Sequence, residues 1–224
     1  MQLPSQPLRA VTLDLDGTLA SSEDVYFNVG HATLNRRGKT FDDDLRNAMM
    51  GRPATAALQV MIDWHGLNDS VETLAAESEQ LFWRFAQDDL KRMPGVDQLF
   101  DLLDERELPR GIATSGGRRY AERILELLGL AGRVAFAITA DDVRQGKPHP
   151  EPYLQAAAKH GVDAAEMLVI EDSAVGSQAG VAAGAYTIAT PNAHTAGHDF
   201  TGVAFVAHTL ADPRIAQALA FRGA

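Results

Sequence analysis

The sequence predicts an α/β protein in which a small all-helical domain interrupts a doubly wound parallel sheet after its first strand. Short apolar runs alternate with helical patterns from about residue 96 onward, and strict alternation is typical of a parallel sheet with helices on both faces. One further apolar run, over residues 8–15, stands apart near the N-terminus. Between these regions the pattern is helical, without a strand signal. We therefore expect an α/β domain built from residues 1–19 and 93–224, and a helical domain over residues 20–92.

The composition allows a sizeable core and limits the partners. The chain has 224 residues, of which 46% are hydrophobic, and a formal net charge of −10 with a sequence pI of about 5.1. This acidity disfavours nucleic acid and anionic membrane surfaces as partners, because both are bound by basic faces. The absence of cysteine excludes disulfides and thiolate chemistry. No segment has the pattern of a signal peptide or a membrane span, so we expect a cytoplasmic protein.

The first apolar run ends in a pair of acidic residues. Asp14 and Asp16 are two positions apart, and side chains two apart on a strand share a face, so both carboxylates are expected to aim at one point. Gly17 lets the chain turn sharply directly after them. Two like charges this close repel each other, and a divalent cation removes that cost. Asp-x-Asp-Gly-Thr-Leu after an apolar strand therefore predicts a metal-binding turn, although an isolated Asp-x-Asp is usually an ordinary polar turn.

The inserted region has the pattern of several helices separated by glycine and proline. Residues able to cap a helix precede apolar stripes, and Gly38 and Gly66 are placed to end helices. The expected helices run from Ser21 or Ser22 to Gly38, from Phe41 to Met50, from about Pro53 to Gly66, and from Asp69 or Ser70 to about residue 92. Pro94-Gly95 marks the return to alternating elements.

The second part of the chain is expected to supply the remaining strands and the helices that cover them. The predicted strands are residues 110–114, 134–138, 167–170, 185–189 and 203–206. The predicted helices are residues 96–103, 118–128, 152–159 and 174–183. Residues 192–202 form a polar loop between the last two predicted strands.

Polar residues follow four of the predicted strands, at their carboxyl ends, where a doubly wound sheet gathers its functional groups. A hydroxyl followed by backbone N–H groups at a helix start is suited to bind an anion. Each fragment alone has an ordinary explanation, as a helix cap or a solvated loop residue. Together and in this order they predict a site for a phosphate and a metal. The fragments are Asp14 with Asp16, Thr114 with Ser115, Lys147 after a loop, and Glu171 with Asp172.

These motifs, in this order, resemble those of the haloacid dehalogenase superfamily of phosphotransferases. The helical insertion is similar to the cap of the β-phosphoglucomutase and phosphoglycolate phosphatase branch. The resemblance implies a Rossmann-like core with such a cap, and it covers essentially the whole chain. The matching segments are Asp14-Leu15-Asp16-Gly17-Thr18, Thr114-Ser115, Lys147 within Gly146-Lys147-Pro148, and Glu171-Asp172-Ser173.

The resemblance implies phosphoryl transfer through a covalent aspartyl-phosphate. Asp14 is expected to be the nucleophile, and Asp16 is expected to protonate the leaving alkoxide and then to take a proton from the attacking water. Lys147 would neutralise charge on the transferring group. The groups expected to bind its oxygens are the Thr114 hydroxyl and the N–H groups of Ser115 and Gly116.

Mg²⁺ is the implied cofactor. Its expected ligands are the Asp14 carboxylate, the Asp16 backbone carbonyl and Asp172. Magnesium prefers few protein carboxylates, several waters and a phosphate oxygen from the substrate, which fits this set. Glu171 is expected beside these ligands, with direct ligation as the alternative.

The helical cap is expected to close over the site and to choose the leaving group. Arg52 and Glu23 are its candidate substrate contacts, and a surface position is an equally good explanation for Arg52. The expected partner is a small phosphorylated metabolite. Sugar phosphates, phosphoglycolate and nucleotide monophosphates all fit the sequence.

Other classes are weighed against a phosphatase. A β-phosphoglucomutase-like enzyme would hand the phosphoryl group to a sugar, and such relatives carry a cap histidine and a cap arginine where ungapped counting gives Tyr26 and Ala54 here. A receiver-type phosphoacceptor signalling module is shorter, has no helical cap and lacks a counterpart of Asp16. A dehalogenase needs neither Asp16 nor the metal, and a silent interaction protein would not need the full set of motifs.

Overall fold

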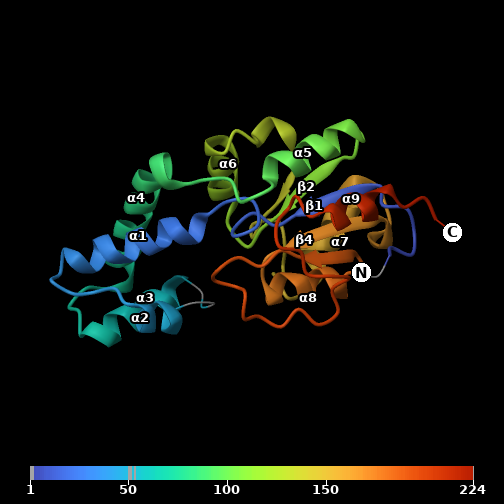
Figure 1. Ribbon diagram of the computed structural model, residues 1–224. Coiled ribbons are helices and arrows are strands. Elements are labelled where there is room, and N and C mark those ends of the chain that lie inside the picture. The colour runs from blue at the N-terminus through green and yellow to red at the C-terminus, as the bar shows by residue number, and fades with distance from the viewer. Residues whose placement is uncertain (1–2, 50–51, 53, 224) are drawn as a thin grey trace. The chain divides into compact units, whose positions relative to one another are not determined.

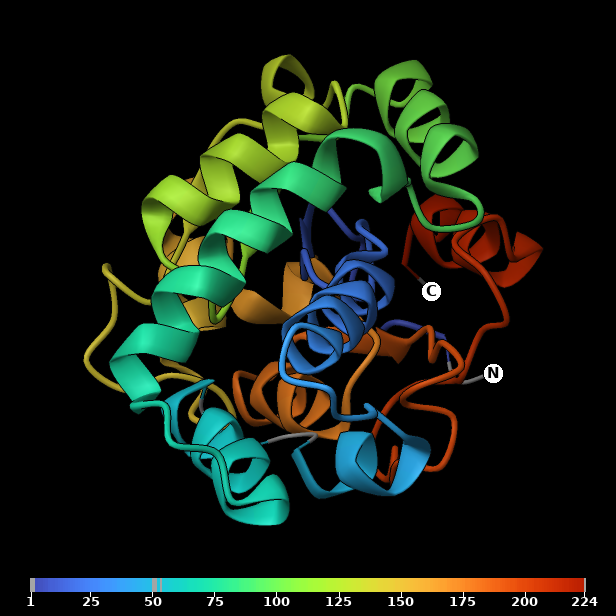
Figure 2. The same cartoon turned by 90° about the vertical axis from the view of Figure 1, so that its left-hand side faces the viewer.

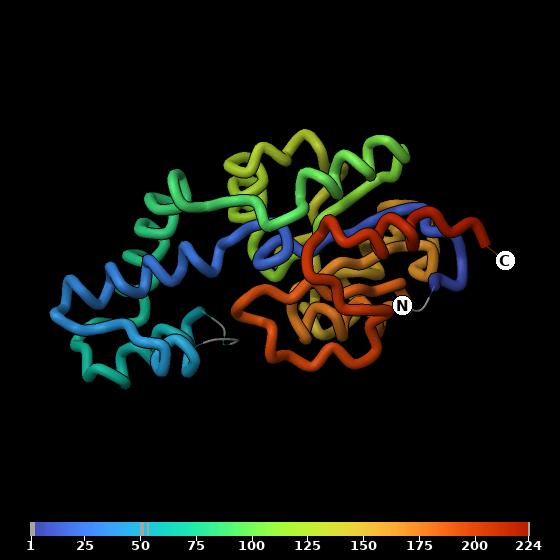
Figure 3. The backbone as a smooth tube through the Cα atoms, viewed as in Figure 1, coloured from blue at the N-terminus to red at the C-terminus, as the bar shows by residue number. Residues whose placement is uncertain are grey.

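The structure, a computed structural model, describes residues 3–49, 52 and 54–223. The chain divides into two compact units, one formed by Met1–Ser21 with Lys91–Ala224 and the other by Ser22–Leu90. The backbone passes from one unit to the other twice, and both connections can be followed in Figure 3. We call the first of these units the α/β unit and the second the helical unit.

The α/β unit is built on a five-stranded sheet with the order β3-β2-β1-β4-β5, in which all neighbouring strands are parallel. The chain builds outward from β1 in one direction, then crosses back and builds outward in the other, so the sheet is doubly wound as predicted. The fold class expected from the sequence is confirmed. The strands are β1 (Ala10–Leu13), β2 (Arg110–Ala113), β3 (Ala137–Ile138), β4 (Met167–Glu171) and β5 (Tyr186–Ala189).

Helices cover both faces of this sheet. Figure 1 shows α5 and α6 on one side of the strands and α8 on the other. On the α8 side, a fully buried cluster joins Ala113 and Val169 of the strands to Tyr153 of α7 and Ala179 of α8. The helices of this unit are α5 (Val96–Glu105), α6 (Arg118–Leu127), α7 (Glu151–His160), α8 (Ala174–Ala182) and α9 (Pro213–Ala220).

Three elements of the α/β unit differ from the sequence prediction. The expected strand over 134–138 is reduced to β3, because a short 3₁₀ turn over Ala131–Arg133 precedes it. The expected strand over 203–206 is not formed, and this segment contacts β5 only through an isolated bridge and a few backbone bonds. Helix α9 was not predicted, although Asp212 caps it and Pro213 is its first residue, which is a common start signal.

The helical unit contains α1 (Ser22–Asn35), α2 (Asp43–Met49), α3 (Ala54–His65) and α4 (Val71–Asp89). Ser70 caps α4 as expected. The second helix starts at Asp43 and not at Phe41, because the Asp42 carboxylate accepts the N–H of Leu45 (2.9 Å) and so begins the helix. Gly51 and Pro53, expected at the next helix start, lie outside the described residues.

Helix α1 packs along α4, and Figure 2 gives a second view of this pair. One apolar cluster of the helical unit joins α1, α2, α3 and α4, and Phe27, Leu58 and Ile62 are partly buried against it. Its buried members are Leu34, Phe41, Leu45, Met61 and Leu74. Residues on the facing sides of α1 and α4 are also buried: Val25, Val29, Leu81, Phe82 and Ala86. Among the described residues, no helix has both the length and the apolar character needed to span a membrane.

Candidate active site

The acidic residues of the first motif are placed by the end of β1 and by a turn. The strand ends at Leu13, and the Asp14 N–H extends the sheet by donating to the Ile170 carbonyl (3.0 Å). The strand does not continue to Asp16, so the expected sharing of one strand face is wrong. A turn at Gly17, with φ of 75°, takes Asp16 to a separate set of partners. A side chain at Gly17 would also collide with the Asp172 carboxylate.

Lys147 joins the first and fourth motifs. Its ammonium group lies 2.6 Å from Asp14 Oδ1, 2.6 Å from Glu171 Oε1 and 2.8 Å from the Ala113 carbonyl. The lysine side chain is 6% exposed, so these contacts form away from bulk water. Charge-assisted hydrogen bonds of this kind are short and strong, and they fix the lysine between the two carboxylates.

The burial of this cluster changes its acid–base behaviour. Burial raises the pKa of Asp14 to about 8, with Lys147 acting in the opposite direction and the neighbouring acidic residues adding to the rise. Burial alone would lower the pKa of Lys147, but Asp14 and Glu171 more than offset it and raise that pKa above its usual value. The lysine therefore stays charged at neutral pH, while Asp14 needs further positive charge to be fully ionised.

Glu171 is held by Tyr153, which the sequence analysis did not single out, and by Ser173 of the fourth motif. The Tyr153 hydroxyl donates to Glu171 Oε1 at 2.6 Å, and the Ser173 hydroxyl donates to Oε2 at 3.1 Å. A side chain at Gly176 would lie 1.8 Å from Glu171 Oε1, so a glycine there leaves room for the carboxylate. Both oxygens of Glu171 thus have protein partners, and Glu171 supports Lys147 directly.

Asp16 is bound by the loop that follows β2. The Tyr120 hydroxyl donates to Asp16 Oδ1 at 2.6 Å, and the Thr114 hydroxyl donates to Oδ2 at 3.3 Å. The Thr114 oxygen in turn accepts the N–H of Gly116 at 3.0 Å. Thr114 is buried and Ser115 is exposed. Asp14 and Asp16, which carry like charges, therefore have different hydrogen-bond donors. Lys147 donates to Asp14, whereas Tyr120 and Thr114 donate to Asp16.

Three of these residues form a group suited to a divalent cation. Carboxylate oxygens of Asp14, Glu171 and Asp172 lie within 4.8 Å of one another, and all three residues are buried. The Asn192 amide donates to Asp172 Oδ2 (3.0 Å) and to the Gly17 carbonyl (3.3 Å), which orients Asp172. Hard divalent cations take oxygen ligands of this kind, so the residues fit the expected metal. Both oxygens of Glu171 already accept bonds from protein groups, whereas the Lys147 contact with Asp14 involves one oxygen, so Asp14 and Asp172 are the better ligands.

The candidate substrate contacts of the helical unit have neighbours within that unit. Arg52 is exposed, and its Nε donates to the Ala48 carbonyl (2.7 Å) at the end of α2. Glu23 lies half-buried in the first turn of α1. Their contact with substrate stays a prediction.

Three residues of the site were missed by sequence reasoning. Tyr120 lies in the first turn of α6, Tyr153 in the first turn of α7, and Asn192 in the loop read only as polar. The first two follow the second and third motifs within a few residues, and that spacing is the one signal that could have drawn notice.

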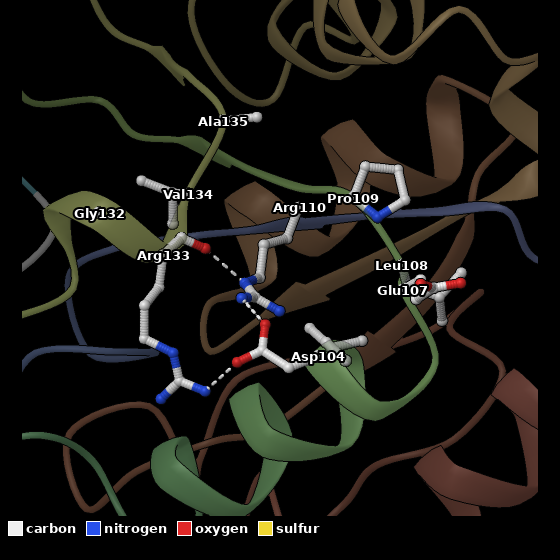
Figure 4. A pocket seen from close by; sticks show the side chains of 10 residues that line it. Asp104, Glu107, Leu108, Pro109, Arg110, Gly132, Arg133, Val134 and Ala135 are labelled. Carbon is white, nitrogen blue, oxygen red and sulfur yellow. Dashed lines mark hydrogen bonds and ion pairs between the residues drawn. The ribbon is translucent and has the colours of Figure 1, made fainter.

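A separate pocket of about 420 Å³ lies at the amino ends of β2 and β3, opposite the strand ends that carry the buried cluster. Figure 4 shows Arg110 and Arg133 in its wall, both directed at Asp104. Arg133 also pairs with Asp101 (2.8 Å). Since both guanidinium groups already have carboxylate partners, this pocket reads as a structural network that ties α5 to β2, and not as a phosphate site.

The fold and the strand-end cluster define the class to which the chain belongs. Residues 11–190 match the family model of haloacid dehalogenase-like hydrolases, so the chain is a member of that family and an enzyme. It is 33% identical over 194 residues to a validoxylamine A 7'-phosphate phosphatase of Streptomyces hygroscopicus subsp. limoneus, which covers 84% of this chain and 88% of that protein. It is 29% identical over 177 residues to a phosphorylated carbohydrates phosphatase of Thermotoga maritima, covering 79% and 82%.

Solved structures agree with the sequence comparisons. The crystal structure of a candidate β-phosphoglucomutase from Thermotoga maritima superimposes with a TM-score of 0.82 at 25% identity, over 95% of this chain and 97% of that chain. The resemblance to the β-phosphoglucomutase and phosphoglycolate phosphatase branch is therefore confirmed.

Proposed function

We propose that this protein is a Mg²⁺-dependent phosphatase that hydrolyses a small phosphorylated metabolite through an aspartyl-phosphate. One observation carries the proposal: a buried aspartate, Asp14, is held by a buried lysine next to a second acidic pair. Folding alone does not favour such a cluster, because buried charges cost free energy unless their partners are well placed. The arrangement matches what phosphoryl transfer needs, which is positioning and charge stabilisation.

In the first half of the reaction, one Asp14 oxygen attacks phosphorus and the bond to the leaving oxygen breaks. Asp16 gives its proton to that leaving oxygen, so an alcohol departs. Lys147 and the Ser115 N–H offset the negative charge of the transferring group, whereas the Gly116 N–H, also expected there from the sequence, already donates to the Thr114 oxygen. When bound, the metal supplies charge neutralisation, and Asp14, the Asp16 carbonyl and Asp172 are the groups that would hold it.

In the second half, water replaces the alcohol. Asp16, now ionised, takes a proton from the water, whose oxygen bonds to phosphorus as the Asp14–phosphorus bond breaks. The products are inorganic phosphate and free Asp14, and Asp16 has regained its proton for the next cycle. The sum is ester plus water giving alcohol plus phosphate.

The substrate class is drawn from the named relatives. Several are phosphatases of phosphorylated carbohydrates, of N-acetylmuramic acid 6-phosphate or of fructose 1-phosphate. We place the substrate of this chain among small sugar phosphates and related metabolites, with the cytoplasm as the site of action. We further propose that the α/β unit is the catalytic core and that the helical unit is the cap, with Arg52 and Glu23 helping to choose the leaving group.

The direct test is a screen of phosphorylated metabolites for phosphate release, with Mg²⁺ and with EDTA. We expect release from some sugar phosphate with Mg²⁺ and its loss with EDTA. Calcium should inhibit, because it accepts more oxygen ligands at longer distances and could draw both Asp14 oxygens into coordination. Activity that is equal with EDTA would contradict the metal-dependent mechanism.

A mutase is the second candidate, because a structurally similar protein is described as a candidate β-phosphoglucomutase. Tyr26, counted at the place of the mutases' cap histidine, contacts Phe82 with ring centroids 4.5 Å apart and the ring planes tilted by 35°, and a tyrosine lacks the imidazole of that histidine. Incubation of β-glucose 1-phosphate with Mg²⁺ and a bisphosphate primer, followed by NMR, separates the two. We expect free phosphate; efficient conversion to glucose 6-phosphate would favour the mutase.

A further inference from the structure

Asp16 has hydrogen-bond donors on both carboxylate oxygens, and the two donors differ. The Tyr120 hydroxyl lies 2.6 Å from Oδ1, whereas the Thr114 hydroxyl lies 3.3 Å from Oδ2. Both donors come from the segment that joins β2 to the first turn of α6. The same segment offers the backbone N–H group proposed to bind phosphate, so the acid–base group is tied to the phosphate-binding loop.

The loop is shaped to let the Tyr120 ring reach Asp16. A Cβ atom at Gly116 would lie 2.7 Å from Tyr120 Cδ1, which is closer than a real contact allows. The ring therefore crosses the loop backbone at a point where only glycine leaves room for it. This close approach is independent of the hydrogen bond and points to the same arrangement.

The Thr114 hydroxyl has only one hydrogen to give. Its oxygen already accepts the Gly116 N–H at 3.0 Å, so its hydrogen goes either to Asp16 or to a phosphate oxygen. A phosphate that takes this hydrogen removes the Thr114 bond to Asp16 Oδ2 and leaves the Tyr120 bond to Oδ1 in place. The asymmetry of the two donors thus singles out one oxygen.

We propose that Tyr120 is a positioning residue for Asp16, and that by holding Oδ1 it leaves Oδ2 as the oxygen that carries the transferred proton. The inference rests on the proposed phosphatase function and adds a residue outside the family motifs. The proton on Oδ2 passes to the leaving oxygen as its bond to phosphorus breaks, and Oδ2 regains a proton from water during hydrolysis of the aspartyl-phosphate. Tyr120 keeps its own proton throughout.

The test compares leaving groups in the Tyr120→Phe variant, which keeps the ring over Gly116 and removes only the hydroxyl. The ratio kcat/KM reports steps up to departure of the leaving group. For the alkyl phosphate that the wild type cleaves best, we expect kcat/KM to fall about tenfold or more, because an alkoxide needs the proton. For p-nitrophenyl phosphate, whose leaving group departs as an anion, the fall should stay below about threefold. Binding of inorganic phosphate should be unchanged.

Two comparisons separate positioning from a structural effect. Tyr186→Phe makes the same chemical change in the first residue of β5, at the other edge of the sheet, and should leave both substrates unaffected. In the Asp16→Asn background, Tyr120→Phe should cost nothing further, because the amide carries no transferable proton for Tyr120 to position. An equal loss on both substrates, or an additive loss in the double variant, would overturn the proposal.

A measurement that requires no turnover tests the hydrogen bond between Tyr120 and Asp16 directly. In protein labelled with [4-¹³C]aspartate, the Asp16 carboxyl resonance, assigned through Asp16→Asn, should shift in Tyr120→Phe and not in Tyr186→Phe. An unmoved resonance would show that Tyr120 does not hold Asp16. If the wild type released phosphate from no ester, the proposed function would fail while this measurement still decided the contact.

Discussion

The two units of the chain treat charge in opposite ways. In the α/β unit, Lys147 and Glu171 pair with side chains only 6% and 1% exposed. In the helical unit, Arg37 pairs with Asp69 and Glu77 at exposures between 17% and 24%. A buried ion pair is strongly destabilised when one partner is lost, whereas a pair near water contributes little. The α/β unit thus concentrates charge where the proposed chemistry uses it, whereas the Arg37 pairs of the helical unit hold helices together.

The comparison is sharpest at Asp14. Asp14→Asn should lower phosphate release at least about a thousandfold, because the amide keeps the shape of the nucleophile and lacks its charge. The fold should be retained, because the amide keeps the volume of the carboxyl group and Lys147 keeps Glu171 as a buried partner. Phosphate release and the thermal midpoint are the measurements. The control is Asp44→Asn on exposed α2 of the helical unit, for which wild-type rates are expected.

Lys147→Met should affect both activity and stability. It leaves Asp14 and Glu171 buried without their shared cation, so we expect a loss of about 3 kcal/mol in the free energy of unfolding. Activity should fall about a hundredfold or more, because the transferring group loses a fixed positive charge. Denaturant unfolding and phosphate release measure the two effects. Lys39→Met makes the same change on the exposed surface of the helical unit, and an equal destabilisation there would remove the contrast between the units.

The sequence predicted the architecture of the α/β unit better than the bounds of its individual elements. Short apolar runs predicted where the central strands lie along the chain. Polar residues at the ends of these strands predicted that Asp14, Lys147 and Asp172 would be neighbours. The strands at the two sides of the sheet were harder to predict, because the segments expected to form strands at 134–138 and 203–206 pair weakly or on one side only. Short edge segments carry the same apolar pattern as central strands, so the pattern alone cannot decide their pairing.

The supporting residues of the site could not be predicted for a different reason. Tyr153 and Tyr120 act through a hydroxyl at the end of an aromatic ring, and an aromatic residue at helical spacing is ordinarily a core residue. Asn192 reaches Asp172 from a loop that is 20 residues further along the chain. Such contacts depend on how distant elements pack, which periodicity and motif spacing do not encode. In the helical unit the sequence predicted the helices, and its candidate substrate contacts, Arg52 and Glu23, stay predictions.

Tyr153→Phe tests the support of the buried cluster with a smaller change. The variant keeps the ring in the core and removes the hydroxyl that donates to Glu171 at 2.6 Å. We expect a loss of about 2 kcal/mol in the free energy of unfolding, as for a buried hydrogen bond to a charged group. Activity should fall only several-fold, because Ser173 and Lys147 still hold Glu171. Denaturant unfolding of this variant beside Tyr186→Phe, which should change little, gives the measurement.

The smallest effect is expected in the helical unit and depends on pH. Hydrogen bonds from Arg37 lower the pKa of both Asp69 and Glu77. Carboxylates with a lowered pKa add stability above their unfolded pKa of about 4, and that stability is lost as the pH falls through the lower folded value. Arg37→Met should therefore weaken the unit modestly at pH 7.

At a pH low enough to protonate both carboxylates in the folded chain as well as the unfolded one, the wild type and Arg37→Met should converge. Hydrogen exchange of the α4 amides at pH 7 and at this low pH measures the stability of the helical unit in both proteins, separately from that of the α/β unit. Arg84→Met, on the exposed side of the same helix, is the matched control and should follow the wild type at both values. A gap between wild type and Arg37→Met that persisted at low pH would show that Arg37 acts by packing its side chain, and the helical unit would then owe less to its charges than the comparison holds.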